Sequence, residues 1–107
     1  MSGYDERQQA MDTKLAQDSE FRFKVTNRRN RLLGMWAAEQ IGVADDAAEA
    51  YAKSVVMSDF EQPGEDDVVR KVLADFQENG VGIDETQLRK KMAELLPVAQ
   101  KQIHNAS

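Results

Sequence analysis

Five basic residues fall within eleven positions of the sequence and are its most informative candidate for binding chemistry. Residues 21–31 carry no acid, so this stretch has a net charge of +5. A guanidinium group offers a planar fork of N–H donors that fits carboxylates and phosphates. Arginine is the commonest residue of the five, which are Arg22, Lys24, Arg28, Arg29 and Arg31.

Two interpretations of this basic stretch remain open from the sequence. Arg28, Arg29 and Arg31 have no acid three or four positions away, so no partner on their own helix neutralises them. They either face solvent or bridge to acidic residues elsewhere, or they form an anion site that holds the phosphates of ADP or ATP. In that second interpretation a nearby aromatic ring contacts the base, and Phe23 and Trp36 are the candidates.

The rest of the chain is acidic and offers no catalytic group. Of 107 residues, 19 are acidic and 14 basic; residues 1–20 have a net charge of -3, and residues 45–67 have a net charge of -7. This acidity argues against a nucleic-acid binder. No cysteine is present, which excludes disulfides and thiol chemistry, and His104 is the single histidine. Without a recognisable nucleophile, metal-ligand set or glycine-rich phosphate loop, we expect no enzyme, no metal and no required cofactor.

No targeting or membrane segment is evident. The first residues after the start are polar, unlike a secretory signal. The apolar run from Leu32 to Ala38 is far shorter than the roughly 20 residues that span a bilayer. We therefore expect a cytoplasmic protein that does not insert into membrane.

The elements that must position the basic stretch are helices. Helical periodicity of apolar residues and the placement of Gly and Pro predict an all-α protein, a small four-helix bundle, with no strands. Gly42 ends the first helix, and Asp84 with Gln87 forms a capping box for the last. Pro97 should kink or end that helix near Leu96. The predicted helices cover about 18–41, 46–61, 65–79 and 84–103.

Apolar stripes indicate which faces are buried. In the first helix, Phe21, Val25, Leu32, Met35 and Trp36 share one face, and we expect Trp36 to anchor the core. Alanines near Trp36 and in the second helix indicate close packing of these two helices. The stripes of the other helices are Tyr51, Val55, Val56 and Phe60; Val69, Val72, Leu73 and Phe76; and Leu88, Met92, Leu95, Leu96, Ala99 and Ile103.

Residues 1–18 differ from the bundle predicted for residues 19–107. Tyr4, Met11 and Leu15 form only a thin apolar stripe. Ordering a residue costs about 1–2 kcal/mol of backbone entropy, which so little buried surface does not offset. We therefore predict a flexible N-terminal segment that becomes ordered on a partner.

Three stretches resemble the zeta-subunit family of alpha-proteobacterial ATP synthase (ATPase) inhibitors. They are YDERQQAMDTKLAQDSE (4–20), FRFKVTNRRNRLLGMWAAEQIG (21–42) and AYAKSVVMSDFEQPGEDDVVRKV (50–72). The resemblance covers about residues 4–103, nearly the whole chain.

The resemblance implies a regulatory inhibitor whose N-terminal helix enters the catalytic head of ATP synthase and blocks ATP hydrolysis. The implied partners are the alpha, beta and gamma subunits, so the protein would be peripheral on the membrane-bound enzyme. The bundle would stay outside as a docking domain. The alternative function is a nucleotide-sensing helical module with little inhibitory activity. The implied inhibitory residues are Tyr4, Asp5, Glu6, Arg7, Met11, Lys14 and Leu15.

Overall fold

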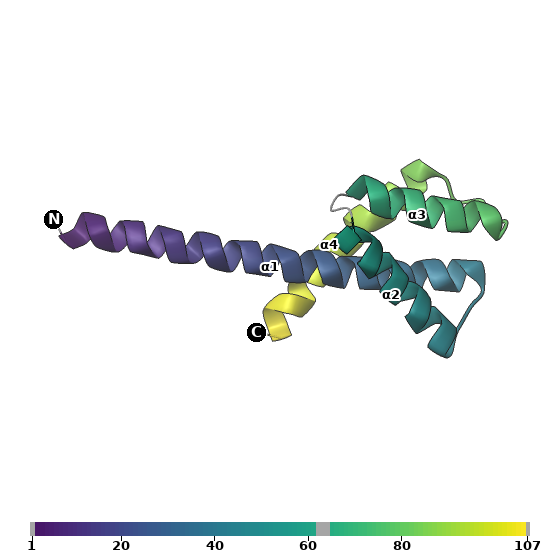
Figure 1. Ribbon diagram of the computed structural model, residues 1–107, viewed down its shortest axis with the longest axis horizontal. Coiled ribbons are helices and arrows are strands. Elements are labelled where there is room, and N and C mark those ends of the chain that lie inside the picture. Colours follow the sequence, from purple (N-terminus) through teal and green to yellow (C-terminus); the bar gives the residue numbers. More distant parts are fainter. Residues whose placement is uncertain (1, 62–64, 107) are drawn as a thin grey trace.

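The part of the chain that the structure describes folds into four helices (Figure 1). The computed structural model describes the backbone of residues 2–61 and 65–106 and the side chains of residues 20–59 and 65–105. The described residues contain no strand, so the predicted all-α fold is confirmed. The helices are α1 (Ser2–Ile41), α2 (Asp45–Glu61), α3 (Glu65–Glu78) and α4 (Glu85–Ala106).

Helix α1 is the longest element and begins earlier than the predicted 18–41. Residues 4–33 contain neither Gly nor Pro, so no residue in this stretch favours an interruption. Its 40 residues span about 60 Å at ~1.5 Å per residue, close to the 64 Å length of the whole chain. The N-terminal part of α1 extends beyond the other helices (Figure 1). The flexibility of residues 1–18 stays a prediction.

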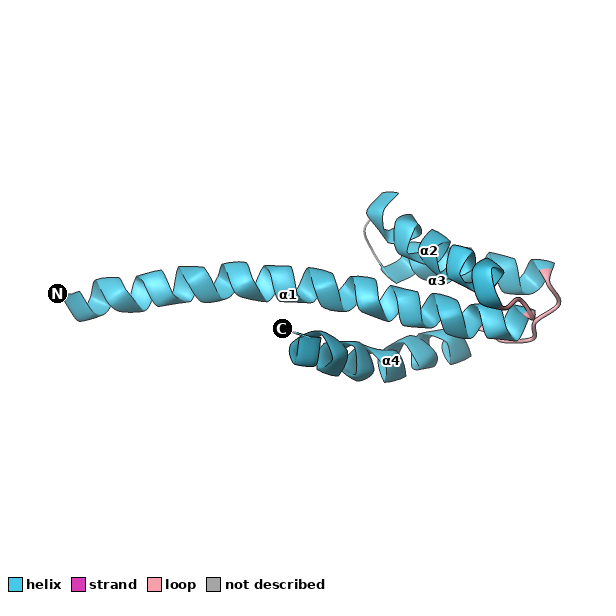
Figure 2. Ribbon diagram, turned by 90° about the horizontal axis from the view of Figure 1, so that it is seen from below, coloured by secondary structure: helices cyan, strands magenta, loops and turns pink. Residues whose placement is uncertain are grey.

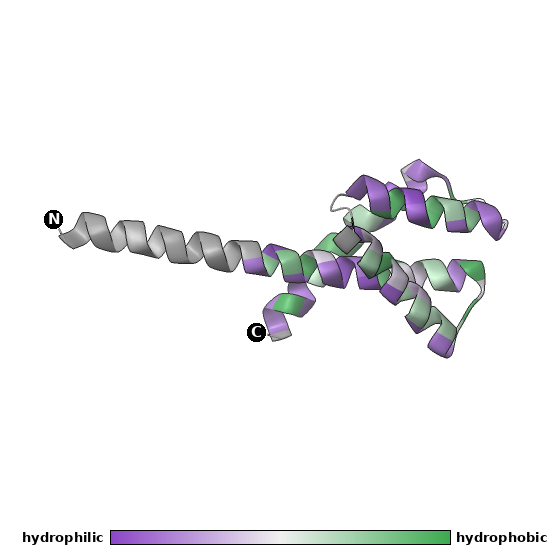
Figure 3. Cartoon of the chain, viewed as in Figure 1, coloured by the Kyte–Doolittle hydropathy of each residue, from purple (hydrophilic) through white to green (hydrophobic). Residues whose placement is uncertain are grey.

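Helix α1 is also the centre of the bundle. Helices α2 and α4 pack against different sides of α1, and α3 packs against all three (Figures 1 and 2). Hydrophobic and hydrophilic residues alternate along α2, α3 and α4, as expected for helices with one buried face (Figure 3). The hydrophobic core residues with no exposed surface are Leu33, Ala37, Ala38, Val55, Val68, Val72, Phe76, Leu88, Met92 and Ala99.

The backbones of α1 and α2 approach closely where Gly34 faces Ala52. A Cβ atom added at Gly34 would lie 2.5 Å from the Ala52 Cα atom and 3.0 Å from its Cβ atom. Ala37, Ala38 and Ala48 are buried beside this crossing. The predicted close packing of alanine-rich helices is confirmed, and it depends on the absence of a side chain at Gly34.

Two predicted helix boundaries are confirmed, the C-terminal end of α1 at Gly42 and the start of α4 at Asp84. Gly42 has a φ of 98°, and Val43 N donates to the Ala38 carbonyl at 3.0 Å, which completes a Schellman motif. At α4, Asp84 N donates to Gln87 Oε1 at 3.0 Å, and Gln87 N donates to Asp84 Oδ1 at 2.8 Å. These reciprocal bonds form the expected capping box.

Pro97 does not end α4, which continues to Ala106. Proline removes one backbone donor and disfavours a helix interior. Met92 and Ala99, on either side of Pro97, have no exposed surface. Packing of these residues on the bundle holds both halves of α4 in place despite the missing hydrogen bond.

Candidate functional site

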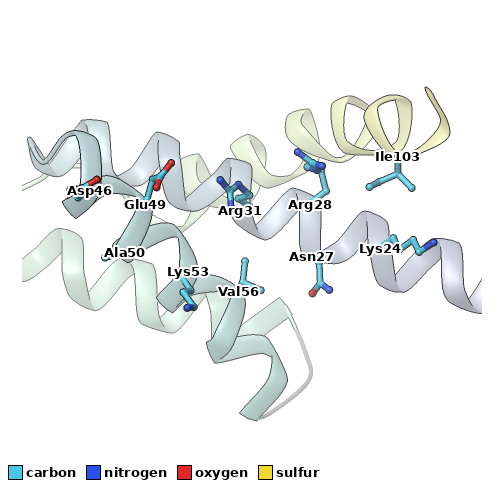
Figure 4. Close-up of a pocket in the computed structure, with 10 residues that line it drawn as sticks. All are labelled: Lys24, Asn27, Arg28, Arg31, Asp46, Glu49, Ala50, Lys53, Val56 and Ile103. Carbon is cyan, nitrogen blue, oxygen red and sulfur yellow. The ribbon is translucent and has the colours of Figure 1, made fainter. Parts of the chain in front are cut away.

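A cleft of about 720 Å³ opens between α1 and α2, near the C-terminal end of α4 (Figure 4). Four basic side chains and two acidic ones contribute to its walls, so we call it the cationic cleft. Its lining residues are Lys24, Asn27, Arg28 and Arg31 of α1, Asp46, Glu49, Ala50, Lys53 and Val56 of α2, and Ile103 of α4.

Charges are unevenly distributed along the cationic cleft. Lys24, Arg28 and Arg31 recur at spacings of four and three, which place them along one face of α1. Asp46 and Glu49 lie at the end away from Lys24 (Figure 4). The basic side chains therefore occupy the part of the cleft nearer to the N-terminal segment.

The arginines of the cleft have no carboxylate partner among residues 20–59 and 65–105, whose side chains the structure describes. Among the described residues, no ion pair involves Arg28, Arg31 or Lys53. Lys24 Nζ lies 3.6 Å from Glu20 Oε1, four positions earlier on α1, and both side chains are exposed. Arg28 and Arg31 thus do not bridge to any acidic side chain that the structure describes, and the cleft can accept an external anion.

Arg29 lies elsewhere and has a structural role. It is buried, and its Nε and Nη2 atoms donate to Asn30 Oδ1 at 3.2 and 3.1 Å. Arg29 Nη1 lies 3.7 Å from Glu65 Oε1, so Arg29 does bridge to the acidic middle of the chain. Burial lowers the pKa of the Arg29 guanidinium, while the carboxylates of Glu65 and Asp59 act in the opposite direction.

The Glu65 carboxylate belongs to a larger ionic cluster that joins α3 to α4. Arg89 Nη1 lies 3.8 Å from Glu65 Oε2. Arg89 also contacts Asp66 Oδ1 at 2.8 Å and Glu85 Oε2 at 2.9 Å. The hydrogen bond from Arg89 lowers the pKa of the Asp66 carboxyl. Arg29 and Arg89 therefore already have carboxylate partners, unlike Arg28 and Arg31.

The two candidate aromatic residues do not line the cationic cleft. Trp36 packs against the core. Its ring lies edge-on to the Phe76 ring, with 5.9 Å between the two ring centroids. Lys91 Nζ lies 5.5 Å from the centroid of the Trp36 ring. Phe23 is 54% exposed on α1. Of the five residues proposed for nucleotide binding, the structure brings only Arg28 and Arg31 together in this cleft.

The side chains that α2 contributes to this site were not predicted from the sequence. Lys53 and Val56 face Arg28 and Arg31 only because α2 folds back along α1. The recurrence of basic residues at 24, 28 and 31 was a local signal for one shared helix face. No comparable signal in the sequence connects Lys53 to that face.

The residues proposed for the inhibitory segment belong to α1, but their side chains lie outside the described residues. They are Tyr4, Asp5, Glu6, Arg7, Met11, Lys14 and Leu15.

The described part of the chain also lacks a metal-binding cluster and a membrane-spanning helix. No group of three or more His, Cys, Asp or Glu side chains there could hold a metal ion. No helix in that part is both long and apolar enough to cross a membrane.

Comparison with known proteins finds one family and one solved structure that are similar to most of the chain. Residues 1–102 match the family model described as ATPase inhibitor subunit zeta. A solved solution NMR structure is 42% identical in sequence, with 79% of this chain and 96% of that chain covered and a TM-score of 0.69. No curated protein sequence gives a significant match.

Proposed function

This chain belongs to the ATPase inhibitor subunit zeta family, and we propose that it blocks ATP hydrolysis by inserting its N-terminal segment into the catalytic head of ATP synthase. Membership of an inhibitor family indicates a regulatory role rather than a catalytic one. The partners in this proposal are the alpha, beta and gamma subunits of the head. The protein would act in the cytoplasm, peripheral to the membrane-bound enzyme.

The observation that supports insertion is the extension of α1 beyond the bundle. The first buried side chain of α1 among the described residues is Val25, and the described residues before it, 20–24, are exposed or half-buried. The segment from Tyr4 to Leu15 carries a thin apolar stripe without a predicted partner in the bundle. A helix with one unpartnered apolar stripe is suited to binding in a groove between subunits.

Deletion of residues 1–18 is expected to abolish inhibition of ATP hydrolysis by the isolated catalytic head, because it removes the inserted helix. Circular dichroism and the amide spectrum should show that residues 19–107 stay folded. Full inhibition by a folded, truncated protein would refute the proposal.

A pair of point variants tests whether the segment binds through its apolar stripe. Leu15→Asp places a charge on the apolar stripe and should weaken inhibition strongly. Thr13→Asp introduces the same charge on the opposite helix face and should have a much smaller effect. Equal effects of the two variants would argue against a helix bound through this stripe.

Nucleotide sensing is the second candidate function, and the cationic cleft is the observation that favours it. Lys24, Arg28, Arg31 and Lys53 could hold the phosphates of ADP or ATP. Titration with ATP should then give saturable amide shifts around Arg28 and Arg31 at millimolar concentration. An unchanged amide spectrum at that concentration would exclude this function.

A further inference from the structure

We propose that the cationic cleft docks a carboxylate-bearing surface of the ATP synthase head, beside the entrance that receives the N-terminal segment. This inference rests on the proposed function and adds a second contact to it. The inserted helix would block the enzyme, and the cleft would position the bundle at the entrance.

The position of the cleft follows from the continuity of α1. One helix runs from the segment proposed for insertion into the bundle without a break. At ~1.5 Å per residue, Lys24 lies about 9 Å and Arg31 about 20 Å along the axis from residue 18. A head that encloses residues 1–18 therefore comes within reach of the basic side chains of the cleft.

The basic side chains of the cleft that have no described ion pair are suited to an external anionic partner. Arg28, Arg31 and Lys53 have no ion pair among the described residues, whereas Arg29 and Arg89 are paired with carboxylates. These cations lie on the surface of a chain whose net charge is -5. A partner with carboxylates would gain charge-assisted hydrogen bonds without displacing bonds within the bundle.

The layout of the cleft favours carboxylates of a protein over a single nucleotide. From residue 24 to residue 31, the basic side chains are distributed over about 10 Å of helix, which suits several separate carboxylates better than one compact polyphosphate. Asp46 and Glu49, at the far end of the cleft, would repel a polyphosphate but attract a basic group of a protein partner (Figure 4). None of the lining residues is aromatic, so no ring is available in the cleft to stack on a base.

Charge reversal in the full-length chain tests the inference. The double variant Arg28→Glu and Arg31→Glu should raise the concentration needed for half-inhibition of the catalytic head by about 10- to 100-fold at low salt. The difference from the unmodified protein should shrink as salt is added, because exposed charges are screened. The amide spectrum of the variant checks that its bundle is folded.

A matched control carries the same change of net charge at a different place. Arg70 and Lys90 are exposed residues of α3 and α4 outside the cleft. The variant Arg70→Glu and Lys90→Glu should inhibit within about threefold of the unmodified protein, because it changes the net charge equally without altering the cleft. It also removes the ion pair of Arg70 with Asp67 at 3.4 Å, and an ion pair of so exposed an arginine contributes little to stability. An equal loss in both double variants would contradict docking at the cleft.

The outcomes separate this inference from the proposed function. Inhibition that is lost on deletion of residues 1–18 but unaffected by the reversal at Arg28 and Arg31 would overturn the docking inference alone. Inhibition that survives the deletion would overturn the proposed function. Saturable ATP binding at Arg28 and Arg31, together with normal inhibition by the reversed variant, would identify the cleft as a nucleotide site and overturn docking.

Discussion

Replacement of Phe76 by alanine is expected to lower the free energy of unfolding by about 3–5 kcal/mol, the usual range for removing a buried phenyl ring. Phe76 has no exposed surface, and its ring meets Trp36 edge-on. The substitution would create a cavity where α3 packs on α1. Chemical denaturation followed by circular dichroism measures the change.

Phe23 provides the matched control for this substitution. It is the same residue type on α1 but is 54% exposed, so the loss in Phe23→Ala should be below about 1 kcal/mol. Trp36 fluorescence should change in the Phe76 variant, because the indole loses its ring partner, and should be much less affected in the control. Similar losses of stability in both variants would show that Phe76 does not have the packing described.

Gly34→Ala is expected to destabilise the protein by about 1–3 kcal/mol, the typical cost of overpacking. Helix propensity alone predicts the opposite sign, since Ala is better than Gly in a helix by about 1 kcal/mol. The steric effect dominates because the new Cβ atom would meet the backbone of Ala52 at 2.5 Å. Backbone atoms cannot rotate away as a flexible side chain can, so the two helices would have to separate.

Gly82→Ala is the control for this prediction. No atom lies within 4 Å of a Cβ built at Gly82, and its φ is outside the left-handed region. This substitution should be neutral or stabilising by up to about 1 kcal/mol. The change in denaturation midpoint should thus have opposite signs at the two positions, and a more stable Gly34→Ala variant would refute the close crossing.

The sequence allowed prediction of the helices because their signals are local. The left-handed residue at Gly42 and the capping box at Asp84 and Gln87 depend on a few neighbouring residues, and both were predicted correctly. Pro97 was a local signal with two possible outcomes, a kink or an end, and the helix does not end there because packing of Met92 and Ala99 outweighs one lost hydrogen bond.

The buried face of α1 was harder to predict because this helix contacts neighbours on more than one side. The apolar stripe indicated Leu32 and Met35, but Leu33 is fully buried and Met35 is 38% exposed. Small and polar residues take part in this core, including Asn30, which has no exposed surface. A stripe of large apolar residues therefore did not identify all the buried positions of α1.

The candidate site was also predictable only in part, because the neighbouring helices decide which side of α1 is buried. The basic stretch was evident in the sequence, but its division into two sides of α1 depends on the other helices. Arg29 faces Glu65, while Arg28 and Arg31 face α2. One position along a helix rotates a side chain by about 100°, so adjacent arginines can have unrelated roles.

The continuity of α1 has a mechanical consequence. When the N-terminal segment is helical and held by a rotary enzyme, an axial load on Ser2 reaches the bundle through one unbroken helix. The load then acts in shear on the crossing of Gly34 and Ala52, where close packing resists sliding. The bundle would then resist a pulling or pushing force on the N-terminal segment, in addition to recognising its partner.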